Sequence, residues 1–116
     1  MDEKIEMYTD GSCYKEKGGW SYVAVIDDEE IQFEHGAGEN TTNNRMELTA
    51  IIKAMLFCEE EVPHTNIIIY TDSMYCNKGY NQWMDKWNSR GWKTSDGGAV
   101  ENIDQWKQLL ELKGYK

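Results

Sequence analysis

The chain has 116 residues, of which 40% are hydrophobic, so it suits one folded domain over 1–116 and excludes a disordered segment. It has no apolar run of about 18 residues, which excludes a membrane-spanning helix, and its charged start lacks the apolar stretch of a signal peptide. The net charge of -9 argues against nucleic acid as a partner, yet residues 77–93 hold Lys78, Lys86, Arg90 and Lys93 against Asp85 alone.

The first third of the chain is expected to form three strands, at residues 4–9, 20–27 and 31–36. In the first strand Ile5 and Met7 share one side, and in the third Ile31 and Phe33 share one face. Lys17-Gly18-Gly19 marks one turn, and the acidic residues 27–30 mark the next. Successive strands joined by short turns predict an antiparallel meander.

The rest of the chain is expected to alternate helices with one further strand. Residues 44–59 repeat apolar side chains at the helical period and lack Gly and Pro, and a connector follows at 62–65. The continuous apolar run 66–70 is typical of a buried strand, and a helical crossover makes it parallel to the first strand. Helices at 74–88 and 100–112, separated by a loop at 89–99, complete a mixed-sheet α/β domain.

Three short acidic motifs carry most of the functional information. They are Tyr8-Thr9-Asp10-Gly11-Ser12, Thr41-Thr42-Asn43-Asn44-Arg45-Met46-Glu47-Leu48 and Tyr70-Thr71-Asp72-Ser73. Asp10 and Asp72 follow strand-like runs that are expected to be parallel neighbours, so both carboxylates should emerge at one sheet edge. Glu47 lies in a first helical turn that can lean over the same edge. Such a cluster favours hard divalent cations, and these cations indicate phosphate chemistry.

Each acidic residue also has a purely structural interpretation. Asp10 with Gly11 fits a turn, Glu47 stands at capping-box spacing from Asn44, and Asp72 with Ser73 fits a helix cap. The three structural interpretations together are harder to sustain, because the inferred topology directs all three carboxylates to one edge. The three cysteines form no C-x-x-C pair, which favours thiols in a reducing cytoplasm over a zinc site.

These motifs resemble the three core motifs of type 1 ribonuclease H. Residues 81–93 resemble the basic handle of that family and residues 100–106 the helix after it, so the similarity spans residues 5 to about 112. The resemblance implies a ribonuclease H-like fold and cleavage of the RNA strand of an RNA–DNA hybrid with Mg²⁺ or Mn²⁺. It implies Asp10, Glu47 and Asp72 as catalytic metal ligands.

The resemblance also implies residues that bind the substrate. Gly11, Ser12 and Cys13 would line the RNA strand, where 2′-hydroxyls distinguish RNA from DNA. Thr42 would contact a DNA phosphate, and Asn43 would contact the minor groove. The handle residues would hold the DNA strand by stacking and phosphate contacts; they are Trp83, Lys86, Arg90, Trp92 and Lys93. Core packing is the competing interpretation for the tryptophans. It is favoured for Trp87 and Trp106, disfavoured for Trp83, and weighted evenly for Trp92.

The chain departs from the family pattern most at its end. The family continues with a fifth strand, a loop histidine and a helix bearing a fourth carboxylate, whereas this sequence stops at Gly114-Tyr115-Lys116 and neither His35 nor His64 matches that histidine. A missing edge strand and helix would expose an apolar surface, which predicts a homodimer or a partner chain covering it. A charged turn at 14–17 and Met74 in place of the usual Gln predict weaker hybrid contacts.

Several functions compete on the sequence alone. The leading one is an RNA–DNA hybrid endonuclease, active by itself or completed by a partner. The alternatives are a hybrid-binding module with little or no cleavage, a structural domain, a related nuclease or integrase, and a reverse-transcriptase ribonuclease H domain. Because the handle-like segment suits a hybrid and the chain starts at Met1 as one uninterrupted domain, a stand-alone hybrid nuclease is favoured.

Overall fold

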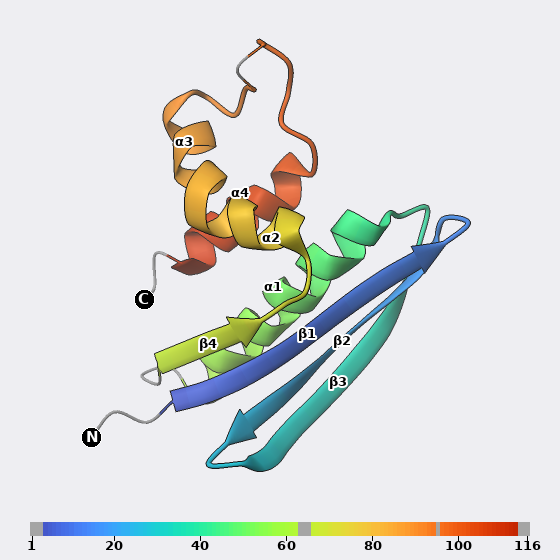
Figure 1. Cartoon of the computed structure of the whole chain (residues 1–116), viewed down its shortest axis with the longest axis vertical. Coiled ribbons are helices and arrows are strands. Elements are labelled where there is room, and N and C mark those ends of the chain that lie inside the picture. Colours follow the sequence, from blue (N-terminus) through green and yellow to red (C-terminus); the bar gives the residue numbers. More distant parts are fainter. Residues whose placement is uncertain (1–3, 63–65, 95, 114–116) are drawn as a thin grey trace.

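The computed structural model describes residues 4–62, 66–94 and 96–113, and its centre is a four-stranded sheet (Figure 1). The strands are β1 (Lys4–Tyr14), β2 (Lys17–Ile26), β3 (Glu29–Glu39) and β4 (Asn66–Tyr70), in the order β3-β2-β1-β4. Strand β2 pairs antiparallel with β1 and β3, whereas β4 pairs parallel with β1. The mixed sheet expected from the sequence is therefore confirmed.

The helices are α1 (Asn43–Glu61), α2 (Met74–Lys78), a π-helical turn η1 (Gly79–Trp83), α3 (Met84–Ser89) and α4 (Ile103–Lys113). Helix α1 lies along one face of the sheet, and α2 to α4 gather beyond the end of β4 (Figure 1). The expected helix at 74–88 forms as three consecutive segments with the π turn in the middle, and the expected helix at 100–112 begins three residues later. The expected connector at 62–65 and the last three residues fall largely outside the described residues.

The turn expected at 17–19 is wrong, whereas the charged turn expected at 14–17 is confirmed. The antiparallel pairing of β1 with β2 continues to Tyr14 opposite Lys17, which leaves Lys15 and Glu16 as a two-residue loop. Both loop residues have positive φ, of 51° and 67°, the conformation that two-residue hairpin loops require. The second hairpin turns at Asp27 and Asp28, also with positive φ, so β3 begins at Glu29 rather than at residue 31.

Strand β1 is also longer than expected, which changes the setting of Asp10. Asp10 lies inside β1 and pairs with Ser21 of β2, so it does not follow the strand. The reason is that β2 accompanies β1 to Tyr14, whereas the parallel partner β4 already ends at the Tyr8–Tyr70 pair. Asp72 does follow its strand, as expected.

The core lies between the sheet and α1 and continues into the other helices. Ile5 and Met7 of β1 are fully buried with Tyr22 and Ala24 of β2 against α1, which confirms the expected inner face of the first strand. A second cluster joins α1 to α2, α3 and α4 around the fully buried Trp106. Two packed clusters that share α1 therefore fix this helix against both the sheet and the helical group.

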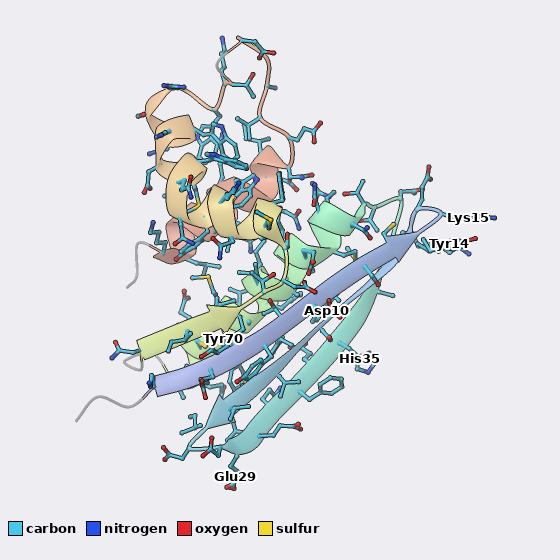
Figure 2. All side chains as sticks on the ribbon, viewed as in Figure 1. Asp10, Tyr14, Lys15, Glu29, His35 and Tyr70 are labelled. Atoms are coloured by element: carbon cyan, nitrogen blue, oxygen red, sulfur yellow. The ribbon has the colours of Figure 1, made fainter. Side chains whose placement is uncertain are left out.

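The sheet face opposite α1 keeps large apolar side chains in contact with solvent. Tyr8, Ile31, Phe33 and Tyr70 are 46%, 43%, 53% and 42% exposed, and the rings of Tyr8 and Tyr70 stack with centroids 4.8 Å apart. Figure 2 shows Tyr70 and His35 on this side of the sheet together with Asp10. No helix covers this face in the part of the chain that the structure describes.

Candidate active site

The sheet brings Asp10 and Asp72 to one edge. Tyr8 and Tyr70 form the last pair between β1 and β4, and each aspartate stands two residues beyond that pair. The Thr9 hydroxyl donates to the Tyr70 carbonyl at 3.1 Å, which ties the two strands where they separate. Both carboxylates are exposed to solvent, so a ligand can reach them.

Helix α1 brings Glu47 to the same edge, because Gly11 lets the helix approach β1 very closely. A Cβ atom at Gly11 would lie 2.5 Å from the backbone nitrogen of Glu47, a distance that no side chain tolerates. Glu47 stands in the first turns of α1, so this contact places its side chain beside Asp10. The absence of a side chain at Gly11 is therefore a geometric condition for the acidic cluster.

Other residues perform the helix-capping roles that were the structural interpretation of Glu47 and Asp72. The Thr42 hydroxyl caps α1 by accepting from the Arg45 N–H, and the Ser73 hydroxyl caps α2 by accepting from the Cys76 N–H. Asp10 lies within a paired strand and not in a turn. The caps thus leave the carboxylates of Glu47 and Asp72 available for another purpose.

The three acidic side chains form a compact cluster. One carboxylate oxygen from each of Asp10, Glu47 and Asp72 lies within 4.8 Å of the others. Burial, followed by the charges of Asp72 and Asp10, raises the pKa of Glu47 to about 7, although the Gly11 N–H acts in the opposite direction. Mutual repulsion of this kind is relieved by a cation placed among the oxygens.

The cluster fits a hard divalent cation. Carboxylate oxygens are the ligands that such ions prefer, and Glu47 Oε1 is buried without a hydrogen-bond partner among the described residues. A buried acceptor without a donor is costly unless something else satisfies it. A metal ion among the three carboxylates would satisfy this oxygen and lower the repulsion together.

The residues expected to line the RNA strand continue along β1 from Asp10. Ser12 is exposed, and the Cys13 thiol donates to the Thr41 carbonyl at 3.3 Å. This bond places the strand beside the start of α1, where Thr42 and Asn43 are both exposed. The structure thus joins two of the expected substrate-binding groups into one surface next to the acidic cluster.

The expected basic handle forms a separate surface on η1, α3 and the following loop (Figure 1). Lys86, Arg90 and Lys93 are exposed on it. Trp106 is fully buried, and Trp87 packs against the core, in line with the core interpretation. Trp92 also packs against the core, beneath the Lys107 ammonium at 5.8 Å from its ring centroid, and Trp83 is half-buried with its ring 5.7 Å from that of Trp87.

Sequence reasoning missed a cavity of ≈ 230 Å³ that borders the acidic cluster. It is lined by Thr71, Asp72, Ser73, Met74, Asn77, Lys78 and Gln82. The spacing of Met74, Lys78 and Gln82, four residues apart on one helical face, is the sequence signal that indicates it. The cavity gives Asp72 a neighbouring recess with one cationic side chain.

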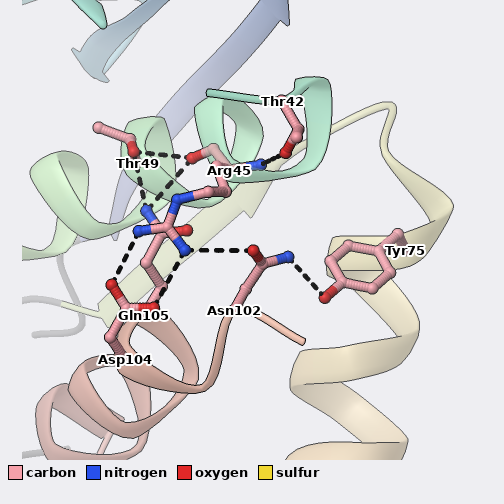
Figure 3. Close-up of polar contacts among 7 residues, drawn as sticks. All are labelled: Thr42, Arg45, Thr49, Tyr75, Asn102, Asp104 and Gln105. Carbon is pink, nitrogen blue, oxygen red and sulfur yellow. Dashed lines mark hydrogen bonds and ion pairs between the residues drawn. The ribbon is translucent and has the colours of Figure 1, made fainter. Parts of the chain in front are cut away.

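A polar network around Arg45 was missed as well (Figure 3). The Arg45 guanidinium donates to both carboxylate oxygens of Asp104, at 3.0 and 2.8 Å, and this interaction holds the pKa of Asp104 below its ordinary value. The residues in contact are far apart in the sequence, so no local spacing indicates the network.

A parallel strand pair with a crossover helix, and an acidic cluster where these strands end, defines an α/β domain of the kind that binds ligands at this edge of its sheet. The sequence model described as RNase H matches residues 2–115. Ribonuclease H of Cyanothece sp. is 42% identical over 112 residues, covering 95% of this chain and 71% of that protein. The chain therefore belongs to the ribonuclease H family.

Solved structures agree with this assignment. The crystal structure of LC9-RNase H1, a type 1 RNase H with the type 2 active-site motif, has a TM-score of 0.82 at 26% identity, covering 97% of this chain and 58% of that chain. LC11-RNase H1 in complex with an RNA/DNA hybrid has a TM-score of 0.73 at 15% identity, covering 97% and 78%, and shows likeness of fold alone. The chain is thus an enzyme of the type 1 ribonuclease H class, whose family and fold support a ribonuclease acting on RNA–DNA hybrids.

No helix among the described residues is long and apolar enough to cross a membrane.

Proposed function

We propose that this chain hydrolyses the RNA strand of RNA–DNA hybrids with Mg²⁺ or Mn²⁺ held by Asp10, Glu47 and Asp72. The observation that carries the proposal is the convergence within 4.8 Å of three carboxylate oxygens, from β1, from α1 and from the segment between β4 and α2. When bound in such a site, a pair of divalent cations activates water and stabilises the leaving oxygen of an in-line displacement at phosphorus.

The protein's own groups orient the substrate in this proposal. Backbone and side-chain groups of Gly11, Ser12 and Cys13 face the RNA strand, where they can recognise 2′-hydroxyls. Thr42 and Asn43 contact a DNA phosphate and the minor groove from the exposed start of α1. These residues lie directly beside the acidic cluster, so the phosphate bound there belongs to the RNA strand.

The handle holds the DNA strand in the same proposal. Lys86, Arg90 and Lys93 present cations, and the partly exposed faces of Trp83 and Trp92 offer stacking surfaces. Because the chain carries a net charge of -9, this local basic surface and the bound cations supply the attraction that the whole molecule lacks.

Cleavage of a labelled hybrid in Mg²⁺ and in Mn²⁺ tests the proposal. We expect cleavage by the wild-type chain, and loss of at least about a hundredfold in Asp10→Asn, because a carboxylate that binds the metal directly contributes more than a partner of such a ligand, which is worth about 10–100-fold. Asp85→Asn removes an exposed carboxylate on α3 and is the matched control. Hybrid binding without cleavage would instead identify a hybrid-binding module, the alternative suggested by a cluster of only three carboxylates among the described residues.

We further propose that a second copy of this chain covers the free edge of β4. Among the described residues this strand has a neighbour on the β1 side only, and its sequence Asn66-Ile67-Ile68-Ile69-Tyr70 carries no charge that would repel an identical strand. The exposed Tyr70 lies on β4 itself, and the exposed Tyr8 lies on the adjacent β1. Light scattering at high micromolar concentration should report a dimer, and a strict monomer would contradict this.

The cytoplasmic location and the single domain over 1–116 stay predictions.

A further inference from the structure

The three carboxylates of the candidate site are held in place by two different means. Asp10 lies in β1 and Asp72 follows the neighbouring β4 by two residues, so the sheet register brings them together. Glu47 belongs to α1, which reaches the edge from outside the sheet. The site therefore needs some connection that fixes the first turns of α1 relative to the segment bearing Asp72.

Arg45 provides the first half of that connection, two residues before Glu47. Its guanidinium donates to Asp104 twice and to Asn102 Oδ1 at 3.2 Å, while its carbonyl accepts from Gln105 Nε2 at 3.2 Å (Figure 3). The same Gln105 nitrogen donates to the Thr49 hydroxyl at 2.9 Å. Side-chain and main-chain groups thus fasten the first turns of α1 to the start of α4.

Tyr75 provides the second half, three residues after Asp72. Its hydroxyl accepts from Asn102 Nδ2 at 3.1 Å and from Trp106 Nε1 at 3.0 Å. Asn102 holds a positive φ of 58° directly before α4, and its carbonyl accepts from the Gln105 and Trp106 N–H groups. One amide side chain therefore links Arg45 to Tyr75, as Figure 3 shows.

We infer that the Tyr75 hydroxyl is a positioning group for the carboxylate cluster, which sets Glu47 against Asp72 through Asn102 and Arg45. The path joins α1, which carries Glu47, to α2, which begins two residues after Asp72, and it passes through Asn102 directly before α4. The inference rests on the proposed function, because it concerns how well the cluster holds a divalent cation. Tyr75 itself does not belong to the acidic cluster.

Tyr75→Phe isolates the hydroxyl, since the ring and its edge contacts with Trp83 and Trp106 remain. The matched control is Tyr22→Phe, which removes another hydroxyl from a buried ring. Tyr22 donates to Glu34 Oε1 at 2.7 Å between β2 and β3, outside the Arg45 network. Tyr75→Phe loses two hydrogen bonds and Tyr22→Phe loses one, but only Tyr75→Phe cuts the connection to Glu47.

The test measures Mn²⁺ binding to the full chain by titration calorimetry at fixed pH, alongside melting without metal. We expect Tyr75→Phe to raise the Mn²⁺ dissociation constant about tenfold, the lower end of what outer-shell groups contribute. The Mg²⁺ concentration for half-maximal cleavage should rise in parallel, with the KM for hybrid changed much less. Tyr22→Phe should melt at a lower temperature but bind Mn²⁺ as the wild-type chain does.

A second variant covers the case in which Tyr75→Phe does not fold. Asp104→Asn breaks the same network at a side chain that is 64% exposed, and Asp85→Asn removes an equally charged carboxylate whose ion pair with Lys113 lies on α3 and α4. Weaker Mn²⁺ binding in Asp104→Asn but not in Asp85→Asn supports the inference. Wild-type Mn²⁺ affinity in both Tyr75→Phe and Asp104→Asn overturns this inference and leaves the proposed function standing. A wild-type chain that binds no Mn²⁺ overturns the proposed function as well.

Discussion

The backbone of Gly11 lies against the backbone of Glu47, so that strand β1 and helix α1 meet without any side chain between them. This contact explains how Glu47 on a helix joins Asp10 in one strand and Asp72 just after the neighbouring strand. Gly11 follows Asp10 directly in β1. Asp10 is exposed on one side of the strand, and Gly11, which has no side chain, leaves room for α1 on the other side. The cluster is therefore a property of backbone packing as much as of acidic side chains.

Gly11→Ala should consequently separate Glu47 from Asp10. The added Cβ would lie 2.5 Å from the Glu47 nitrogen, and backbone cannot give way as a flexible side chain does. We expect a loss of about 1–3 kcal/mol in the free energy of unfolding, as for other overpacked sites, together with weaker Mn²⁺ binding. Gly19→Ala is the control, because its Cβ would meet only the Gly36 carbonyl oxygen at 3.6 Å. Melting curves with and without Mn²⁺ check both, and a Gly11→Ala chain that behaves like Gly19→Ala would refute the prediction.

The raised pKa of Glu47 predicts how stability depends on pH without metal. Burial and the neighbouring Asp72 and Asp10 raise this pKa from 4.5 to about 7, so the folded chain holds the proton more tightly than the unfolded chain. The resulting stabilisation is fully present below pH 4.5 and is lost as the pH rises through about 7. Glu47→Gln should remove this part of the pH dependence in melting experiments.

Divalent cations should oppose that loss. Mn²⁺ binds the ionised carboxylates, so it should raise the melting temperature more at pH 7.5 than at pH 5.5 in the wild-type chain. Glu60→Gln, an exposed change on the same helix, should keep both effects. An equal shift by Mn²⁺ at the two pH values, or a shift as large in Glu47→Gln as in the wild-type chain, would contradict Glu47 as a ligand.

The sequence predicted the acidic cluster because each carboxylate stands beside a strong local signal. The apolar runs before Asp10 and Asp72 and the helical period after Glu47 identify the elements, and the crossover rule then makes β1 and β4 parallel. The length of β1 was not predictable in this way, since it depends on hairpin pairing that continues past Asp10 to Tyr14. Local alternation cannot reveal how far a partner strand extends.

The Arg45 network was not predictable for a related reason. Arg45 and Asp104 are 59 residues apart, and their contact depends on how α4 packs on α1. The same holds for Asn102, whose positive φ and two side-chain partners follow from tertiary structure and not from its neighbours in the sequence. Residues that orient a site through others leave little local trace, whereas residues that form the site stand in recognisable motifs.

The handle should contribute to hybrid binding through charge. Replacing Lys86, Arg90 and Lys93 together by Ala should weaken hybrid binding for all sequences alike, because these side chains face phosphates and not bases. Each lost phosphate contact lowers the slope of log affinity against log salt by about 0.7–0.9, so the slope should fall by up to roughly 2–3. Binding isotherms at several salt concentrations measure this, and Lys4→Ala, an exposed change at the start of β1, is the control. An unchanged salt slope would place the DNA strand elsewhere.

Gly79 should be the least replaceable residue of the helical group. It opens the π-helical turn η1, and a Cβ there would lie 3.0 Å from Cζ3 of Trp106 and closer still to Cη2 and Cζ2 of the same ring. Trp106 is fully buried and its Nε1 donates to the Tyr75 hydroxyl, so the ring cannot move without breaking that bond.

Gly79→Ala should therefore destabilise the fold by about 1–3 kcal/mol, which lowers the melting temperature of a chain of this size by roughly 4–8 °C per kcal/mol. Near-ultraviolet circular dichroism should change as well, because the displaced indole belongs to a cluster with Tyr75 and Trp87. Gly98→Ala is the matched change, since its Cβ would meet only Thr94 and Asp96 side-chain atoms at 3.4 and 3.5 Å. If Gly79→Ala melted and absorbed like Gly98→Ala, the close packing of η1 on Trp106 would not limit this position.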